Sequence, residues 1–166
     1  YVGLGRSERF PDYWELISKE TADSVSAFNA DPEKTTQLDL GYLFARGQWT
    51  GSVSAFYNHI DDYLLIQSGV VKPMGMMGRR TTTITRNIEA HSWGGEAELG
   101  YAINDNWRVD ASLAYVRGEN DTDDKSLAQL PPLEARFGLH YDDGTWSYGA
   151  LWRAVAKQTH VSVNQG

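Results

Sequence analysis

Alternation of apolar and polar residues dominates the segment from Ala45 to Tyr115. In residues 107–115 every second position is apolar, and the run begins and ends with an aromatic residue: Trp107, Val109, Ala111, Leu113 and Tyr115. The intervening positions are charged or small. Successive side chains of a β-strand point to opposite sides, so this period of two predicts a strand with one apolar and one polar face.

The aromatic residues at the ends of the apolar face help to distinguish between two kinds of all-β protein. A soluble β-sandwich buries its apolar face in a core. A membrane barrel exposes that face to lipid between two aromatic girdles and keeps a polar lumen. The same pattern recurs in residues 49–57 and 95–101, and the six Trp and nine Tyr suit interfacial girdles. The sequence therefore predicts an all-β fold, an antiparallel up-and-down meander that forms part of a transmembrane outer-membrane β-barrel.

Short and long connections alternate between the expected strands. Short links are expected near Arg46, Asp105 and Asp143, and long loops at 6–34, 67–80 and 118–132. FPDYWELI favours a helical turn after a proline, and the β-branched run TTTITRNI favours an early start of the strand that contains it. Outer-membrane barrels have short periplasmic turns and long extracellular loops, so we expect the long loops to lie outside the cell.

Composition excludes several functions. The net charge of −7 and the absence of a basic patch argue against a nucleic-acid partner. Without cysteine the chain has no disulfide or thiolate site. No nucleophile and base are grouped as in an enzyme, and the four histidines, His59, His91, His140 and His160, show no metal-binding spacing. We expect neither an enzyme nor a firmly bound cofactor.

The sequence has the features of a fragment. It begins in what resembles the middle of a strand, and about seven strands are expected in residues 1–166. Open sheet edges are not stable in lipid, so seven strands imply part of a larger barrel. Outer-membrane lipid is then the expected environment, in the bacterial outer membrane.

Five segments, taken in order, resemble TonB-dependent outer-membrane receptors. They are GRSERFPDYWEL, NADPEKTTQLDLGY, FYNHIDDYLLI, RNIEAHSWGGEAELGY and LPPLEARFGLHY. MGMMG, RNIEAHSWGGE and AQLPPLEARFGL are most similar to the copper-receptor branch. The resemblance implies a 22-stranded barrel plugged by an N-terminal domain that lies outside this sequence. It also implies energised uptake of a metal, with copper favoured, driven by the inner-membrane TonB complex through the plug.

Methionines are the most specific candidate ligands. All three, Met74, Met76 and Met77, lie between a proline and a glycine in one expected loop. Thioether sulfur is a soft ligand suited to Cu(I), whereas packing at a loop tip is the alternative explanation for such side chains. The residues thus predict a copper contact, with the remaining ligands outside this sequence.

The polar face of the strands is expected to carry a network of charges in the lumen. Its members are Asp39, Glu96, Glu98, Arg108, Asp110, Glu134, Arg136 and Arg153. Glu98 and Arg108 are one pair that the strand register could bring together. The acidic groups at Asp61-Asp62 and 121–124 are interpreted as solvated. Two other functional classes stay open at this point: a passive outer-membrane pore or adhesin barrel, and a soluble all-β binding domain.

Overall fold

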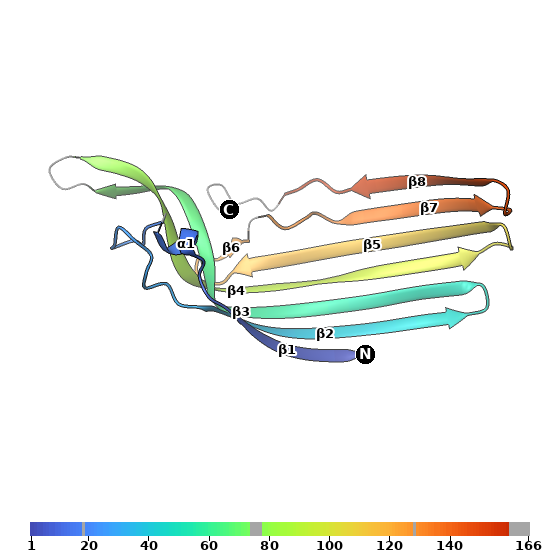
Figure 1. Ribbon diagram of the computed structural model, residues 1–166, viewed down its shortest axis with the longest axis horizontal. Helices are drawn as coiled ribbons and strands as arrows, with labels where there is room; N and C mark the ends of the chain where they lie inside the picture. Colours follow the sequence, from blue (N-terminus) through green and yellow to red (C-terminus); the bar gives the residue numbers. More distant parts are fainter. Residues whose placement is uncertain (18, 74–77, 128, 160–166) are drawn as a thin grey trace.

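One antiparallel sheet forms the body of the protein (Figure 1). The computed structural model describes residues 1–159 apart from 18, 74–77 and 128. Its strands are β1 (Val2–Arg9), β2 (Glu33–Arg46), β3 (Trp49–Pro73), β4 (Arg79–Ala102), β5 (Trp107–Asn120), β6 (Lys125–Ser126), β7 (Glu134–Asp142) and β8 (Ser147–Val155). They follow one another across the sheet in chain order, and β6 lies off this path, paired with β5. This order confirms the predicted antiparallel meander.

Strand register keeps the two predicted faces separate across the whole sheet. Leu113 on β5 lies opposite Ala97 on β4 and Ala135 on β7. The next residue, Ser112, lies opposite Glu98 and Arg136. Because residues directly opposite one another share a face, the apolar positions form one continuous surface and the polar positions form the other.

Aromatic rings gather at both ends of the apolar face. Near the short turns, the ring centroids of Trp49 and Tyr101 lie 4.4 Å apart, and those of Trp107 and Tyr141 lie 4.8 Å apart. Near the long loops, Trp93 and Tyr115 meet edge to face at 5.5 Å. Aromatic pairs of this kind prefer tilted or offset contacts, and their placement matches the two predicted girdles.

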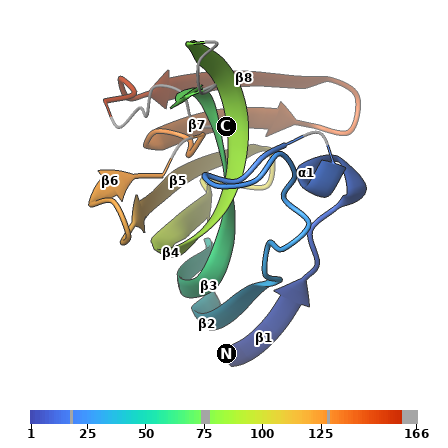
Figure 2. The ribbon, with the colours of Figure 1, turned by 90° about the vertical axis from the view of Figure 1, so that its left-hand side faces the viewer.

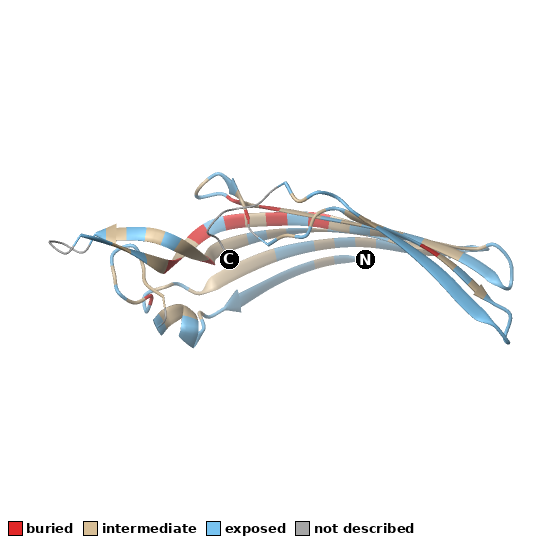
Figure 3. Cartoon of the chain, turned by 90° about the horizontal axis from the view of Figure 1, so that it is seen from above, coloured by how far each residue is buried: buried red, intermediate tan, exposed pale blue. Residues whose placement is uncertain are grey.

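Between the two aromatic rows the sheet has no core among the described residues. Val53 and Leu113 on the apolar face are 53% and 48% exposed. The buried apolar cluster lies instead at the end of the long loops, where it consists of Leu65, Ile88, Ala90 and Leu127, and Figure 3 shows the buried residues gathered there along β4. So large an exposed apolar surface requires a cover, which lipid supplies in a membrane barrel.

Two of the short turns depend on glycine in the left-handed region. Gly47 has a φ of +60° in the link between β2 and β3, and Gly144 has a φ of +83° between β7 and β8. In the second turn Asp143 Oδ1 accepts the backbone N–H of Trp146 at 2.7 Å. This hydrogen bond holds the pKa of Asp143 below its usual value. Such turns fix the register of the strands that they join.

The helix α1 (Tyr13–Ile17) lies in the first long connection. Asp12 Oδ1 accepts the N–H of Glu15 at 2.7 Å, and the Glu15 carboxylate accepts the N–H of Asp12 at 2.8 Å. This reciprocal pair is a capping box, which satisfies two N–H groups at the helix start and confirms the predicted helical turn. Among the described residues no helix has the length and hydropathy needed to cross a membrane.

The predicted loop at 67–80 is wrong over most of its length. β3 continues to Pro73, β4 already begins at Arg79, and these two residues pair. The β-branched run that starts at Thr81 favours a strand. Irregular pairing between Ile60 and Tyr63, and again further along β3, allows so long a hairpin to twist away from the sheet. Figure 1 shows this extension at the left.

The other two long loops are shorter than predicted. β1 reaches Arg9 and β2 begins at Glu33, so the first connection is reduced at both ends. β5 reaches Asn120, and the two-residue β6 folds back against it. The predicted alternation of short and long connections is nevertheless confirmed, with the short turns at one end of the sheet and the long segments at the other (Figure 1).

Candidate functional site

Three segments meet at the long-loop end of the sheet. These are the first connection (10–32), the outer part of the β3–β4 hairpin, and the connection from β5 to β7. In Figures 2 and 3, α1 and β6 lie on opposite sides of the sheet. Alternate residues of β4 explain this, because Thr85 and Asn87 contact the first connection while Arg86 contacts the other.

Glu20 attaches the first connection to the edge of β4. Its backbone forms a parallel bridge at Ile84: the Glu20 N–H donates to Thr83 O at 3.3 Å, and the Thr85 N–H donates to Glu20 O at 2.7 Å. Its carboxylate accepts hydrogen bonds from Arg80 at 2.6 Å and from Lys72 at 2.9 Å. These two cations, Arg80 first, lower the pKa of Glu20 from 4.5 to about 2.

Lys72 extends the attachment into the loop. Beyond Glu20, its amine donates to Thr21 O at 2.9 Å and to Ser24 O at 3.0 Å. The amine therefore has three acceptors, the number of its N–H bonds. We call the group Glu20, Lys72 and Arg80 the loop clamp. It holds both strands of the hairpin extension, because Lys72 lies on β3 and Arg80 on β4.

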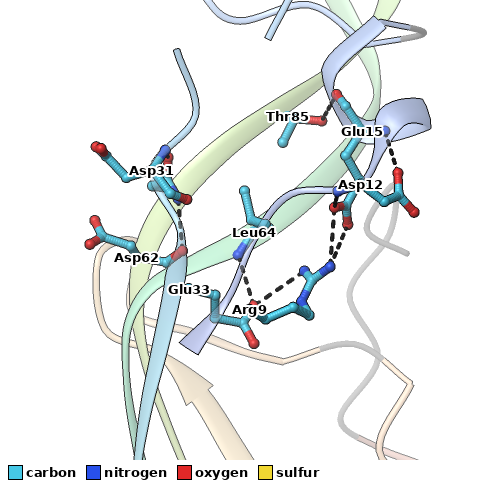
Figure 4. Close-up of polar contacts among 9 residues, drawn as sticks. Arg9, Asp12, Glu15, Asp31, Glu33, Asp62, Leu64 and Thr85 are labelled. Carbon is cyan, nitrogen blue, oxygen red and sulfur yellow. Dashed lines mark hydrogen bonds and ion pairs between the residues drawn. The ribbon is translucent and has the colours of Figure 1, made fainter. Parts of the chain in front are cut away.

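A second group of polar contacts fastens the start and end of the same connection (Figure 4). The Arg9 guanidinium lies between the carboxylates of Glu15, at 3.1 Å, and Glu33, at 3.4 Å. Glu33 also accepts the N–H of Leu64 on β3 at 3.3 Å. Asn87 on β4 donates to two backbone carbonyl oxygens of neighbouring segments. The first connection is thus bound to the hairpin at several separate points.

On the other side of the hairpin, the carboxylate of Asp123 binds the guanidinium of Arg86. The two form an ion pair, and Asn120 Nδ2 donates to Asp123 at 2.7 Å. The Arg86 hydrogen bond is the main cause of a lowered pKa for Asp123. Asp121 contacts His91 instead, at 2.8 Å. The acidic residues of this connection therefore face different partners, and no calcium-type loop forms among them.

The family can be decided from the whole sequence. Residues 1–166 match the family model described as TonB dependent receptor-like, beta-barrel. The chain belongs to this family. The predicted resemblance and the predicted fold class are both confirmed by this match and by the sheet described above. TonB-dependent receptors are transporters of the bacterial outer membrane and not enzymes, so the alternative of a soluble all-β binding domain is wrong.

Among solved structures, this receptor chain is similar to the copper transporter OprC. The two share 45% sequence identity with a TM-score of 0.87. The likeness covers 99% of this chain and 25% of the OprC chain, so this chain spans about a quarter of the length of that relative. The comparison with curated proteins gave no match.

The predicted methionine ligands lie outside the described residues. Met74, Met76 and Met77 fall between Pro73, the last residue of β3, and Gly78, which precedes β4. The residues on either side of this segment are described and form paired strands. Pro73 pairs with Arg79, and the loop clamp holds the next pair inward, Lys72 and Arg80.

Part of the expected charge network forms ion pairs on the polar face of the receptor sheet, but the one pair that was predicted by name does not form. Glu134 binds Arg136 and Arg153, each at 2.5 Å. The predicted pair of Glu98 with Arg108 is wrong. The register places Arg108 opposite Ala102, which is closer to the turn than Glu98 is. Sequence reasoning also missed a pair that involves a histidine. His140 Nε2 lies 2.6 Å from Asp110 Oδ1. The two side chains are diagonal neighbours on β7 and β5, because the register places His140 opposite Arg108 and Asp110 opposite Gly138.

Proposed function

We propose that this chain is part of the barrel of an outer-membrane receptor that takes up copper with energy from the TonB complex. One observation supports this above all, namely the 45% identity to the copper transporter OprC over 99% of the chain. Residues 1–166 would then form about seven strands of a larger barrel, closed by strands outside this chain. Closure removes the two open edges at β1 and β8.

The proposed partners follow from that assignment. Lipid of the outer membrane covers the apolar face between the aromatic rows. A plug domain outside this chain fills the lumen, faces the charges of the polar side, and passes energy from the inner-membrane TonB complex. This energised route distinguishes the receptor from a passive pore or adhesin barrel. Copper uptake that stops when the proton-motive force is collapsed is the expected result.

Within this receptor, Met74, Met76 and Met77 are proposed to contact copper as it enters. They are the only methionines of the chain and occupy one hairpin connection. Thioethers bind the soft ion Cu(I) and carry no proton that competes with the metal. The loop clamp supports the proposal, because through Glu20 it holds the two strands that this segment connects in the sequence.

Replacing all three methionines by leucine in the full-length receptor tests this role. Leucine keeps the volume and apolarity and removes the sulfur. We expect Cu(I) affinity and copper uptake by cells to fall at neutral pH. The deficit should persist at mildly acid pH, where carboxylate ligands weaken but thioethers do not. Unchanged uptake and affinity would contradict a role for the methionines in copper binding.

Loop lengths also predict the orientation of the receptor in the membrane. Asp23 lies in the long first connection and Asp105 in a short turn, and both are exposed. A cysteine at position 23 should react with an impermeant thiol reagent on intact cells, whereas one at position 105 should react only after the outer membrane is opened. The opposite labelling pattern would reverse the orientation.

A further inference from the structure

A cluster of possible metal ligands lies just beyond the aromatic row at the long-loop end. Tyr57 belongs to that row, and two residues further along β3 the same face carries His59. His59 lies directly opposite His91 on β4. Asp61 follows on β3, and Glu89 lies two residues from His91 on β4. The register thus brings an imidazole and two carboxylates together from two adjacent strands.

The spacing of these groups suits a metal ion. His59 Nε2 lies 3.1 Å from Asp61 Oδ1. One ligand atom each from His59, Asp61 and Glu89 lies within 4.8 Å of the other two. Ligands of a tetrahedral ion bonded at about 2.0–2.1 Å are roughly 3.3 Å apart, so small rotations of exposed side chains would close the set.

Local charge favours a cation at this point. No Lys or Arg in the described parts of the chain forms an ion pair with Asp61 or Glu89. Lys34 lies opposite Asp61 in the strand register, but its amine binds Asp62 at 3.4 Å. Two carboxylates therefore converge on an imidazole without a basic partner. Like charges this close are unfavourable unless a positive charge joins them.

The fold holds the donors in this arrangement. Pairing between β3 and β4 becomes irregular after Ile60, and Asp62 has a φ of +59°. Such a bulge redirects the side chains beside it. On the other strand, His91 stacks against Tyr57 and binds Asp121 at 2.8 Å, so the residue opposite His59 is itself fixed.

We propose that His59, Asp61 and Glu89 form a binding site for a divalent first-row metal ion, of the Zn²⁺ or Cu²⁺ type. One imidazole nitrogen with two carboxylate oxygens suits these ions. Ca²⁺ and Mg²⁺ prefer ligand sets made of oxygen alone, and Cu(I) prefers sulfur. The site lies on the outward face of the barrel wall, so it is separate from the proposed uptake route and does not rest on the proposed function.

Metal titration of the full-length receptor in detergent tests the site. The background carries leucine at positions 74, 76 and 77, so that the methionine segment contributes nothing. Zn²⁺ is the only metal added, and its binding is measured by competition with a coloured chelator. We expect the background receptor to bind one Zn²⁺ equivalent more than the same receptor that also carries Glu89→Gln or His59→Gln. Each of these changes should weaken that equivalent roughly tenfold or more, as losses around a metal site do.

Glu119→Gln is the matched control. Glu119 is an acidic residue opposite His91 on β5, but its carboxylate binds Arg117 at 2.8 Å, so its loss should leave Zn²⁺ binding unchanged. Cu²⁺ should show the magnetic resonance signature of one nitrogen ligand, absent in His59→Gln. Equal Zn²⁺ affinity and stoichiometry in all variants would overturn the proposal, as would displacement of Zn²⁺ by millimolar Ca²⁺.

Discussion

Replacement of Ala111 by Arg should prevent most of the receptor from assembling as a barrel. Ala111 lies on the apolar face of β5, midway between Trp107 and Tyr115, and it is exposed. An Arg on the lipid face near the middle of the membrane costs about 2–4 kcal/mol. That is a large fraction of the stability of an ordinary folded domain. The measurement is the fraction of receptor in the outer membrane that migrates as a folded barrel before heating.

The neighbouring residue supplies a matched control. Ser112 lies on the same strand at nearly the same depth, but its side chain is on the polar face between Glu98 and Arg136. An Arg at position 112 gains an acidic neighbour on one side and meets a basic one on the other, so its net cost should be small. If both variants assembled equally well, the division of the sheet into lipid and lumen faces would be wrong.

The two faces could be predicted because the period of two is a local property. Once Trp107 and Tyr115 are placed on one face, the side of every residue between them is fixed. Hairpin turns are equally local, since Asp142, Asp143 and Gly144 carry their own hydrogen-bonding and φ preferences. Fold class, turn positions and the assignment of residues to the two faces therefore follow from local sequence, without knowledge of the contacts between strands.

Register could not be predicted in the same way. The predicted pair of Glu98 and Arg108 required a relative shift of β4 and β5 that the chain does not adopt. For the same reason the cluster of His59 and Glu89 could not be predicted. These residues are far apart in sequence and come together only through the pairing of β3 with β4. The bulge after Ile60 alters this register further, and single-strand patterns do not reveal it.

The sequence pattern also could not predict which distant residues the loops would contact. Pro11, Pro32 and the polar residues between them correctly indicated a connection without long strands. Nothing in that stretch indicated that Glu20 would reach the edge of β4 or would meet Lys72 and Arg80. Those contacts join residues more than 50 positions apart, so they depend on the tertiary arrangement of the hairpin.

Replacement of Glu20 by Gln should weaken the attachment of the first connection to the hairpin through the loop clamp. The change keeps the shape of the side chain and removes the charge that binds Lys72 and Arg80. Lys72, which is mostly buried, would then lose its charged partner and keep only neutral acceptors, the Gln amide oxygen and the backbone carbonyl oxygens of the loop. Amide hydrogens of residues 19–27 should exchange severalfold faster with solvent at neutral pH, whereas those of the strands between the aromatic rows should not change.

Acid should break the ion pairs of Glu20 in the wild-type receptor, whereas the Glu20→Gln variant has no carboxyl group at position 20 to protonate and lacks this step. The pKa of Glu20 is lowered from 4.5 to about 2, so the attachment is complete above pH 4.5 and is lost as the pH falls through 2. Asp23→Asn is the control, because it removes an exposed negative charge from the same connection at a site without a basic partner among the described residues. Faster exchange in Asp23→Asn equal to that in Glu20→Gln would mean that the net charge of the loop, and not the clamp, holds it in place.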